Sequence, residues 1–518
     1  MSGAALIWAG LAFASWAEVA FDALMLLPLL FFAACVVYLL LLLLNAIRIR
    51  KRVVLLARPD IAGGATDTPA KNLQANTLIL PIDTHSAGIN AKAAENKAPE
   101  GNTAEDIARF VLLIPAHNEE LLLGAALSAL QQLHYPRSHY EIIVIADNCS
   151  DSTASIARNA GALALERSDK ARIGKGYALE DTLQWLIADN AQSLIVNSKL
   201  NSNFNAEPTE NKTVDQNIVR RGSTTLNPGT LDGDITAWNR ARQFEAVVIL
   251  DADTFVSSNM LSAFSEALRH GEQIVQVRYD VFNTDDSWRT RLMSCALALA
   301  HVVKPLGRER LQLSDGLKGN GMCFTRDVVV KVPWSGESIT EDIEYTLRVC
   351  REGFRVAYVP EACVWAQMPV TGAQAASQRQ RWEGGRYRLL FKVAPQLLLE
   401  SLRTRNRLLR DRAIELIVPP FAEMFALPLA LGLVCILASV LLGWHTALLF
   451  ASAWGLVLAL QAAYLLTGMW VARMSWRVVL SLLFAPLYIV WKLGLYIVMA
   501  VGRSAGGWKR TERHELTK

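Results

Sequence analysis

Long uncharged stretches lie near both ends of the chain, and the middle alternates short apolar runs with amphipathic segments. The first uncharged stretch, Ala23–Ile47, exceeds the roughly 20 residues with which an α-helix crosses a bilayer. Glu18 and Asp22 precede it, and four basic residues follow: Arg48, Arg50, Lys51 and Arg52. By the positive-inside tendency, residues 1–52 contain a transmembrane helix with its N-terminus outside and the following chain in the cytosol. We expect the apolar residues 4–21 to form an interfacial or partly inserted helix.

A second uncharged region, residues 424–472, is interrupted by a Gly-Trp-His sequence and predicts two transmembrane helices. The last apolar run, Val478–Gly502, contains a proline and Lys492. If this run also spans the membrane, the basic tail 503–518 lies outside, against the positive-inside tendency. Residues 421–502 therefore predict two or three helices, and the last run is either re-entrant or an exception to the rule.

Residues 386–420, which precede these helices, combine Leu and Phe with eight basic residues. This composition predicts amphipathic helices in the cytosolic interface, with Arg side chains facing lipid phosphates. The basic residues are Arg386, Arg388, Lys392, Arg403, Arg405, Arg407, Arg410 and Arg412.

Two other segments lack any sustained periodicity of apolar residues. Residues 53–108 are rich in Ala, Asn, Thr, Gly and Pro and predict a flexible cytosolic tether. Residues 190–234 are dominated by Asn, Ser, Thr and Gly and predict a surface insertion.

The remaining pattern over residues 109–385 is that of an α/β domain. Three buried strands are predicted, at Arg109–Pro115, Glu141–Asp147 and Phe244–Asp251. Helices are predicted after them, at 119–133, 152–160 and 258–269. This alternation predicts a doubly wound, mainly parallel sheet covered on both faces. Ligands of such sheets lie beyond the carboxyl ends of strands, where Asn118, Asp147 and Asp251 occur.

Composition narrows the class of protein. Apolar residues make up 52% of the 518 residues, which favours a membrane protein. The net charge of +4 is too small to suggest a nucleic-acid partner, and membrane lipids are the expected partner of the basic segments. The seven cysteines are scattered without a C-x-x-C pair, which argues against a disulfide scaffold or a zinc site.

The sequence Asp251-Ala-Asp253 follows a predicted strand. Two carboxylates spaced by one residue can hold an oxygen-ligated cation and leave its other positions for phosphate and water. Such a cation would offset the charge that builds on a departing diphosphate. Asp253 is the first candidate ligand, and Asp251 is the candidate for ribose or a metal-bound water. A solvated acidic pair at a strand end is the alternative.

The sequence Thr340-Glu341-Asp342 opens a predicted helix at 342–350. An attacking hydroxyl must lose a proton, and Asp342 is the candidate general base. An ordinary helix N-terminus, where a cap and negative charge are favoured, is the alternative. Glu341 is expected to orient groups or to be structural.

Gln378, Arg381 and Trp382 share one face if residues 375–385 are helical. Arg381 can bind a diphosphate in a bidentate manner, and Trp382 can stack on a sugar. A basic helix on lipid, with Trp382 at headgroup level, is the alternative.

Lys175 lies between Gly174 and Gly176 before a predicted helix, an arrangement that allows contact with a phosphate. A plain loop is the alternative reading of this short motif.

Together these motifs resemble the inverting family 2 glycosyltransferases, which include cellulose, chitin and hyaluronan synthases and ceramide glucosyltransferase. Seven motifs from about Phe110 to Arg386 carry the resemblance. They are P-A-H-N-E (115–119), D-N-C-S-D (147–151), G-K-G-Y-A-L (174–179), D-A-D (251–253), G-N-G-M-C-F (319–324), T-E-D (340–342) and Q-R-Q-R-W (378–382).

The resemblance implies a GT-A (Rossmann-like) fold, a UDP-sugar donor, Mg²⁺ or Mn²⁺, and inversion at the anomeric carbon. It places Asp147 near the nucleobase, Asp251 and Asp253 at ribose and metal, and Asp342 as base. The other implied donor-site residues are Asn118, Glu119, Lys175, Gln378, Arg381 and Trp382. The implied acceptor-site residues are Gly319, Asn320, Gly321, Glu341 and Trp382.

We therefore expect a plasma (inner) membrane enzyme with a cytosolic catalytic domain. It would transfer a hexose or N-acetylhexosamine to a polysaccharide or lipid-linked acceptor, possible auxiliary export or assembly proteins being further partners. The small number of predicted spans after residue 385 leaves processive elongation and single addition to a lipid carrier or ceramide-type acceptor both open. A nucleotide-sugar sensor or scaffold, and a small transporter, are the non-enzymatic alternatives.

Overall fold

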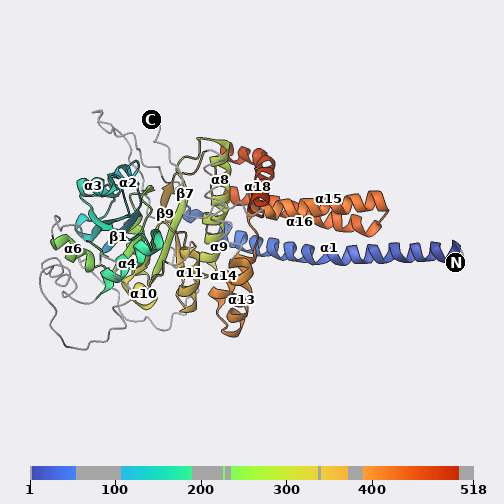
Figure 1. Cartoon of the computed structure of the whole chain (residues 1–518), viewed down its shortest axis with the longest axis horizontal. Helices are drawn as coiled ribbons and strands as arrows, with labels where there is room; N and C mark the ends of the chain where they lie inside the picture. The colour runs from blue at the N-terminus through green and yellow to red at the C-terminus, as the bar shows by residue number, and fades with distance from the viewer. Residues whose placement is uncertain are drawn as a thin grey trace.

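The computed structural model describes residues 3–53, 56, 107–188, 226–227, 235–336, 340–370 and 389–500. It has an α/β domain from one side of which a bundle of long helices projects (Figure 1). Most of the expected tether and of the expected insertion, the Q-R-Q-R-W motif and the basic tail lie outside the described residues.

One nine-stranded sheet forms the α/β domain, in the order β4-β3-β2-β1-β5-β8-β7-β9-β6. Strands β1, β2, β3, β5, β7 and β9 run in one direction, and β4, β6 and β8 run in the other. The strands are β1 (Phe110–Ala116), β2 (Tyr140–Asp147), β3 (Leu163–Arg167), β4 (Leu226–Asn227), β5 (Ala246–Ile249), β6 (Thr254–Val256), β7 (Ile274–Val281), β8 (Met322–Thr325) and β9 (Val356–Ala366). The expected doubly wound, mainly parallel α/β sheet is confirmed.

Helices cover both faces of this sheet, because alternate side chains of a strand point to opposite faces. On β1, Phe110 and Leu112 join one apolar core and Val111 and Leu113 join the other. The first core includes α2 (Leu123–Gln131), α3 (Thr153–Asn159) and α7 (Met260–Arg269). The second includes α4 (Lys175–Ile187), α6 (Ile235–Arg242), α10 (Arg326–Lys331) and α11 (Glu341–Arg351). The single turn η4 (Arg137–His139) leads into β2.

Three helices of the described chain are long and apolar enough to cross a membrane. They are α1 (Gly3–Arg48), of which Trp16–Arg48 is the candidate span, α15 (Phe421–Leu442) and α16 (His445–Val471). The expected interfacial helix over 4–21 is not a separate element, since α1 continues through it without a break. The sequence has no glycine or proline between residues 11 and 27 to end a helix there.

The last apolar run does not form one long helix. It consists of α17 (Trp476–Leu480), the 3₁₀ turn η7 (Ser481–Phe484) and α18 (Ala485–Ala500). In Figure 1, α18 lies at the base of the projecting helices, and α17 and η7 contact α8. The described residues of this run are not among the candidate spans, which after the α/β domain are α15 and α16.

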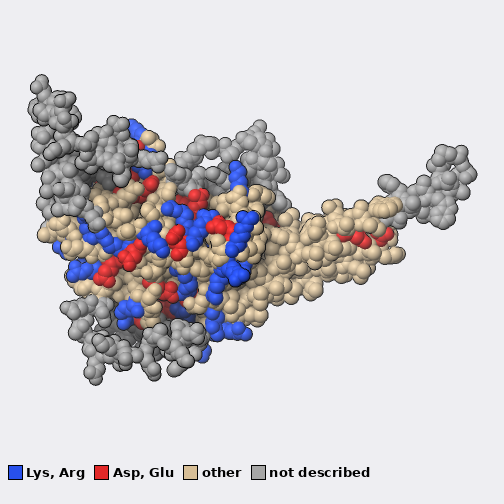
Figure 2. Space-filling view, turned by 90° about the horizontal axis from the view of Figure 1, so that it is seen from below, with Lys and Arg blue, Asp and Glu red and all other residues tan. Residues whose placement is uncertain are grey.

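Charged side chains are concentrated on the α/β domain and at the base of the projecting helices (Figure 2). On the face shown in Figure 2, Lys and Arg gather over the α/β domain and at the base of the helices. The projecting helices show few charges there apart from acidic side chains near their far end. At that end the Thr446 hydroxyl lies 2.8 Å from Glu18 and 3.1 Å from Asp22.

A buried ionic network joins the bundle to the domain. The Arg308 guanidinium, on α9 (Lys304–Arg310), donates hydrogen bonds to Asp411, Glu415 and the hydroxyl of Tyr38 on α1. Asp411 and Glu415 belong to α14 (Arg407–Ile417), which follows α13 (Ala394–Arg403). Burial of these charges is tolerated because each is paired.

The two helices α13 and α14 occupy part of the segment expected to lie on lipid, but Arg412 does not face lipid phosphates. It is 5% exposed and donates a 2.6 Å hydrogen bond to Asp411. The expectation is wrong for this residue because α14 packs against α11 and α13 through an apolar face of its own.

Candidate active site

The candidate site lies at the edge of the sheet where the parallel strands end. Asp147 closes β2, Asp251 follows β5, and Gly319–Gly321 precedes β8, which pairs with β5. Parallel strands place their carboxyl ends at one edge, so residues far apart in the sequence meet there.

Lys175 is the first residue of α4 and connects two of these segments. Its ammonium donates hydrogen bonds to Oδ1 of Asp251, at 2.5 Å, and to the carbonyl oxygen of Gly319. Burial alone would lower the pKa of Lys175, but Asp251 and the acids of the T-E-D motif raise it above its ordinary value. Lys175 is therefore a fixed cation among carboxylates.

Asp342 lies in the first turn of α11 and faces the same place. A Cβ added to Gly319 would lie 3.5 Å from Oδ2 of Asp342 and 3.8 Å from the nitrogen of Lys175. Oδ1 of Asp342 accepts a 2.8 Å hydrogen bond from the backbone N–H of Ile343. Burial raises the pKa of Asp342, while that hydrogen bond and Lys175 act to lower it.

Glu341 is the neighbouring carboxylate. Burial, and then repulsion from Asp342, raise the pKa of Glu341 to about 7. A like charge disfavours a second ionised group, which is why Asp342 adds to the effect of burial on Glu341.

The Asp251-to-Asp253 loop is held by Asn320. Oδ1 of Asn320 accepts from the backbone N–H of Asp251, at 3.2 Å, and its amide nitrogen donates to the Thr254 hydroxyl, at 2.7 Å. Asn320 is 1% exposed. Asn320 therefore holds this loop directly. The sequence predicted it only as a residue of the acceptor site.

Asp251 and Asp253 offer oxygen ligands of the kind that Mg²⁺ or Mn²⁺ prefers, and a diphosphate and water would complete such a site. Among the described residues, no three His, Cys, Asp or Glu side chains gather into a metal site made by protein alone. Mg²⁺ is commonly bound through one or two carboxylates together with substrate phosphates and water. Asp251 is partly exposed, whereas Asp253 is only 3% exposed.

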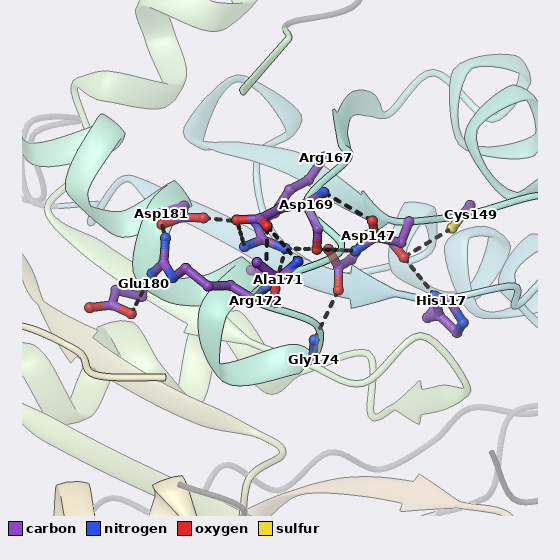
Figure 3. Close-up of polar contacts among 12 residues, drawn as sticks. His117, Asp147, Cys149, Arg167, Asp169, Ala171, Arg172, Gly174, Glu180 and Asp181 are labelled. Carbon is purple, nitrogen blue, oxygen red and sulfur yellow. Dashed lines mark hydrogen bonds and ion pairs between the residues drawn. The ribbon is translucent and has the colours of Figure 1, made fainter. Parts of the chain in front are cut away.

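Asp147 lies in a buried ionic network (Figure 3). The Arg167 guanidinium, at the end of β3, contacts Asp147 at 2.6 Å and Asp181 at 2.8 Å, and its side chain is fully buried. Oδ2 of Asp147 accepts a 3.2 Å hydrogen bond from the backbone N–H of Gly174, the residue before Lys175. Arg167 and Asp181 were not predicted, and the network ties the D-N-C-S-D motif to the start of α4.

Asn118 and Glu119 link the loops after β1 and β2. Asn118 has a left-handed backbone (φ 55°), and its Oδ1 accepts a 2.8 Å hydrogen bond from the N–H of Ser150. The N–H of Glu119 donates to the Thr153 hydroxyl at 2.9 Å. Both residues thus lie at the predicted edge of the sheet, beyond the carboxyl ends of its strands. Their observed contacts join the loop after β1 to the loop after β2.

Gly321 has a steric reason to be glycine. Its φ is +66°, and an added Cβ would lie 2.8 Å from Val277 and 2.9 Å from Val364. The loop before β8 therefore packs closely over β7 and β9. Gln378, Arg381 and Trp382 lie outside the described residues, and their roles stay predictions.

Comparison with known sequences places this site in a family. Residues 111–189 match the family described as Glycosyl transferase family 2, and residues 214–385 match that described as Glycosyltransferase like family 2. The chain carries a family 2 glycosyltransferase domain. All the predicted site residues fall within the region from 111 to 385.

Curated relatives of this glycosyltransferase domain are distant. The probable glycosyltransferase YdaM of Bacillus subtilis (strain 168) is 24% identical over 297 residues, which are 56% of this chain and 58% of that protein. The β-monoglucosyldiacylglycerol synthase of Trichormus variabilis is 24% identical over 57% of this chain and 52% of its own. The poly-β-1,6-N-acetyl-D-glucosamine synthase of Staphylococcus aureus (strain COL) is 22% identical over 57% and 59%. The chain thus spans between about half and three fifths of the length of these relatives.

Among solved structures, a mannosyltransferase of Pyrobaculum calidifontis in complex with GDP-Man and Mn²⁺ aligns with a TM-score of 0.38. The two chains are 17% identical, and the alignment covers 70% of this chain and 86% of that one. At that score the likeness supports no statement about the substrate of this glycosyltransferase domain.

Proposed function

We propose that this protein is an integral-membrane, inverting glycosyltransferase that moves a hexose or N-acetylhexosamine from a UDP-sugar to a polysaccharide or lipid-linked acceptor. The observation that carries the proposal is the meeting of Lys175, Asp251, Gly319 and Asp342 at one sheet edge. A cation, a metal-binding carboxylate and a carboxylate for proton removal are the parts that this reaction needs.

In this mechanism the residues have separate tasks. Mg²⁺ or Mn²⁺ at Asp253 and Asp251 would offset charge on the departing diphosphate. Lys175 adds a fixed positive charge at the same place. Asp342 accepts the proton of the attacking acceptor hydroxyl, because its Oδ1 is held by the N–H of Ile343 while Oδ2 faces Gly319 and Lys175.

The membrane helices support a reaction at the cytosolic face of the plasma (inner) membrane. Arg50, just after the first candidate span, stacks on Trp470 near the end of α16, with its guanidinium carbon 3.9 Å from the ring centre. Basic residues at the domain end of the bundle are expected on the cytosolic side. The acceptor would then reach the site from the adjacent leaflet.

A single-addition glycolipid synthase is the second candidate. The described chain has two candidate spans after the α/β domain, and the last apolar run is broken into short helices. This small bundle favours a lipid acceptor that needs no export channel, and one relative is named as a glycolipid synthase.

The test uses the full chain in mild detergent with Mn²⁺ or Mg²⁺ and a panel of UDP-sugars. Dioleoylglycerol in phosphatidylglycerol vesicles and an N-acetylglucosamine pentamer serve as acceptor probes, and UDP release and product length are measured. Acceptor-dependent UDP release with one donor supports the proposal, and a product ladder or a single addition separates its two forms. Binding of UDP without release from any donor would instead favour a sensor.

A further inference from the structure

A helix that contacts both the sheet and the membrane bundle contains a five-residue π-helical turn. It runs from α8 (Trp288–Ala298) through η6 (Leu299–Val303) into α9. Leu299, Val302 and Val303 of the turn are at most 2% exposed and pack within the apolar core shared with the membrane helices. π-Helical turns are rare and occur often at functional sites.

This helix is held tightly against the bundle at two glycines. A Cβ added to Gly307 would lie 2.3 Å from the carbonyl oxygen of Leu42 on α1. A Cβ added to Gly468 on α16 would lie 2.4 Å from Leu299. The π-helical turn therefore has a fixed position between the membrane helices and the sheet.

His301 lies on this turn and contacts the sheet. Its ring stacks on Tyr279 of β7, with ring centres 5.3 Å apart and planes at 22°. Nδ1 of His301 lies 3.3 Å from the carbonyl oxygen of Tyr279, so Nδ1 is the donor. Tyr358 fixes the turn further by donating a 2.7 Å hydrogen bond to the His301 carbonyl oxygen.

The second ring nitrogen of His301 is a hydrogen-bond acceptor. With Nδ1 donating, a neutral ring carries its lone pair on Nε2. Burial, and then the charge of Lys318, lower the pKa of His301 to about 3, which keeps the ring neutral at physiological pH. No hydrogen-bond partner of Nε2 occurs in the described part of the chain, and the residue is partly exposed.

Tyr279 connects His301 to the candidate active site. Tyr279 lies three residues after Gln276 on β7, and the side-chain amide of Gln276 donates a 2.9 Å hydrogen bond to the carbonyl oxygen of Asn320. Asn320 in turn braces the backbone of Asp251. Contacts thus lead from Asp251 through Asn320 and strand β7 to His301, on the side of the site that faces the membrane helices.

We propose that His301 and Tyr279 form an acceptor-binding surface, in which Nε2 of His301 accepts a hydrogen bond from a hydroxyl of the acceptor. The inference rests on the proposed function and adds a binding residue to it. A neutral imidazole suits this task because the hydroxyl of the acceptor molecule donates its proton to a lone pair, which Nε2 provides. An uncharged acceptor molecule also needs no counter-ion in the protein. The position suits it because the ring lies between the catalytic carboxylates and the bundle from which a membrane-bound acceptor would come.

The test compares His301→Phe, which keeps an aromatic ring but no lone pair, with His301→Gln, which keeps a hydrogen-bond acceptor. The KM of whichever acceptor probe gives transfer, the dioleoylglycerol vesicles or the N-acetylglucosamine pentamer, is measured with the full chain. Loss of one hydrogen bond predicts a rise of about five- to tenfold in this KM for His301→Phe, with partial recovery in His301→Gln. The affinity for UDP and the rate of UDP-sugar hydrolysis without acceptor should not change.

Three outcomes would overturn the inference. An unchanged acceptor KM in His301→Phe would show that the imidazole does not contact the acceptor. A parallel loss of UDP affinity and Tm would show a packing role only. A wild-type protein that transfers to neither probe would remove the proposed function, and this inference with it, so the two failures are distinguishable.

Discussion

The ammonium nitrogen of Lys175 lies 2.5 Å from Oδ1 of Asp251, although 76 residues separate them in the sequence. The contact joins the G-K-G motif at the start of α4 to the D-A-D motif after β5. Because Asp342 faces the same ammonium, one cation acts on both the proposed metal ligand and the proposed base.

Removal of this cation should change the pH dependence of the reaction. Lys175 acts to lower the pKa of Asp342, so Lys175→Met should raise that pKa and move the acidic limb of the kcat/KM profile to higher pH. Lys170→Met, which removes an exposed lysine of the preceding loop, is the matched control. An acidic limb that stays in place in Lys175→Met would contradict the proposed coupling.

Glu341→Gln should stabilise the protein at high pH. The pKa of Glu341 is about 7 in the folded protein against an ordinary 4.5, so ionisation of Glu341 costs stability as pH rises through that interval. The variant should therefore have a higher Tm than wild type at pH 8, by roughly 2–4 °C for each kcal/mol gained in the free energy of unfolding. Near pH 4 the two proteins should have an equal Tm. Asp327→Asn, which removes another acid from a helix first turn, should show no such pH-dependent gain.

The buried Arg167 should be essential for stability. Arg167→Met leaves the buried acids Asp147 and Asp181 without their shared counter-charge and should cost about 3–5 kcal/mol. Arg158→Met removes an exposed pair with Glu166 and should cost about 1 kcal/mol or less. Thermal unfolding in detergent compares the two, and equal losses would refute the importance of the buried network.

Gly307→Ala should separate α9 from α1. The added Cβ would meet the Leu42 carbonyl oxygen at 2.3 Å, and backbone on both sides must shift. Gly124→Ala on α2 is the control, since its Cβ would meet only Ile156, at 3.7 Å, and alanine favours a helix. We expect Gly307→Ala to lower Tm and transfer while Gly124→Ala keeps or raises both; a Gly307→Ala variant with wild-type Tm would contradict the close helix crossing.

The sequence predicted those parts of the fold that depend on local pattern. Uniform apolar runs identified β1, β2 and β5, and uncharged length identified the spans of α1, α15 and α16. Strands β3, β4 and β6 to β9 were not predicted, because their positions in the sheet depend on pairing with strands that are distant in the sequence.

The predicted site residues were found from motifs, whereas their partners were not. Arg167 ends a short strand in a sequence that looks like a solvated surface, yet it is fully buried because two acids from other segments meet it. His301 lies in a helix whose period is shifted by the π-helical turn, so no regular pattern marks its face. The sequence predicted that Arg412 faces lipid, but α14 packs against α11 in the structure. Each of these depends on tertiary contacts that one sequence does not contain.

The role of Asp342 as the base is tested most directly by sugar transfer in Asp342→Asn, with UDP affinity measured on the same preparation. Asp327→Asn, an exposed acid in the first turn of α10, is the matched control. We expect Asp342→Asn to bind UDP as wild type does while transfer falls by about 10²–10⁴-fold, and Asp327→Asn to keep both. Transfer by Asp342→Asn at the wild-type rate would contradict the assignment of Asp342 as the base.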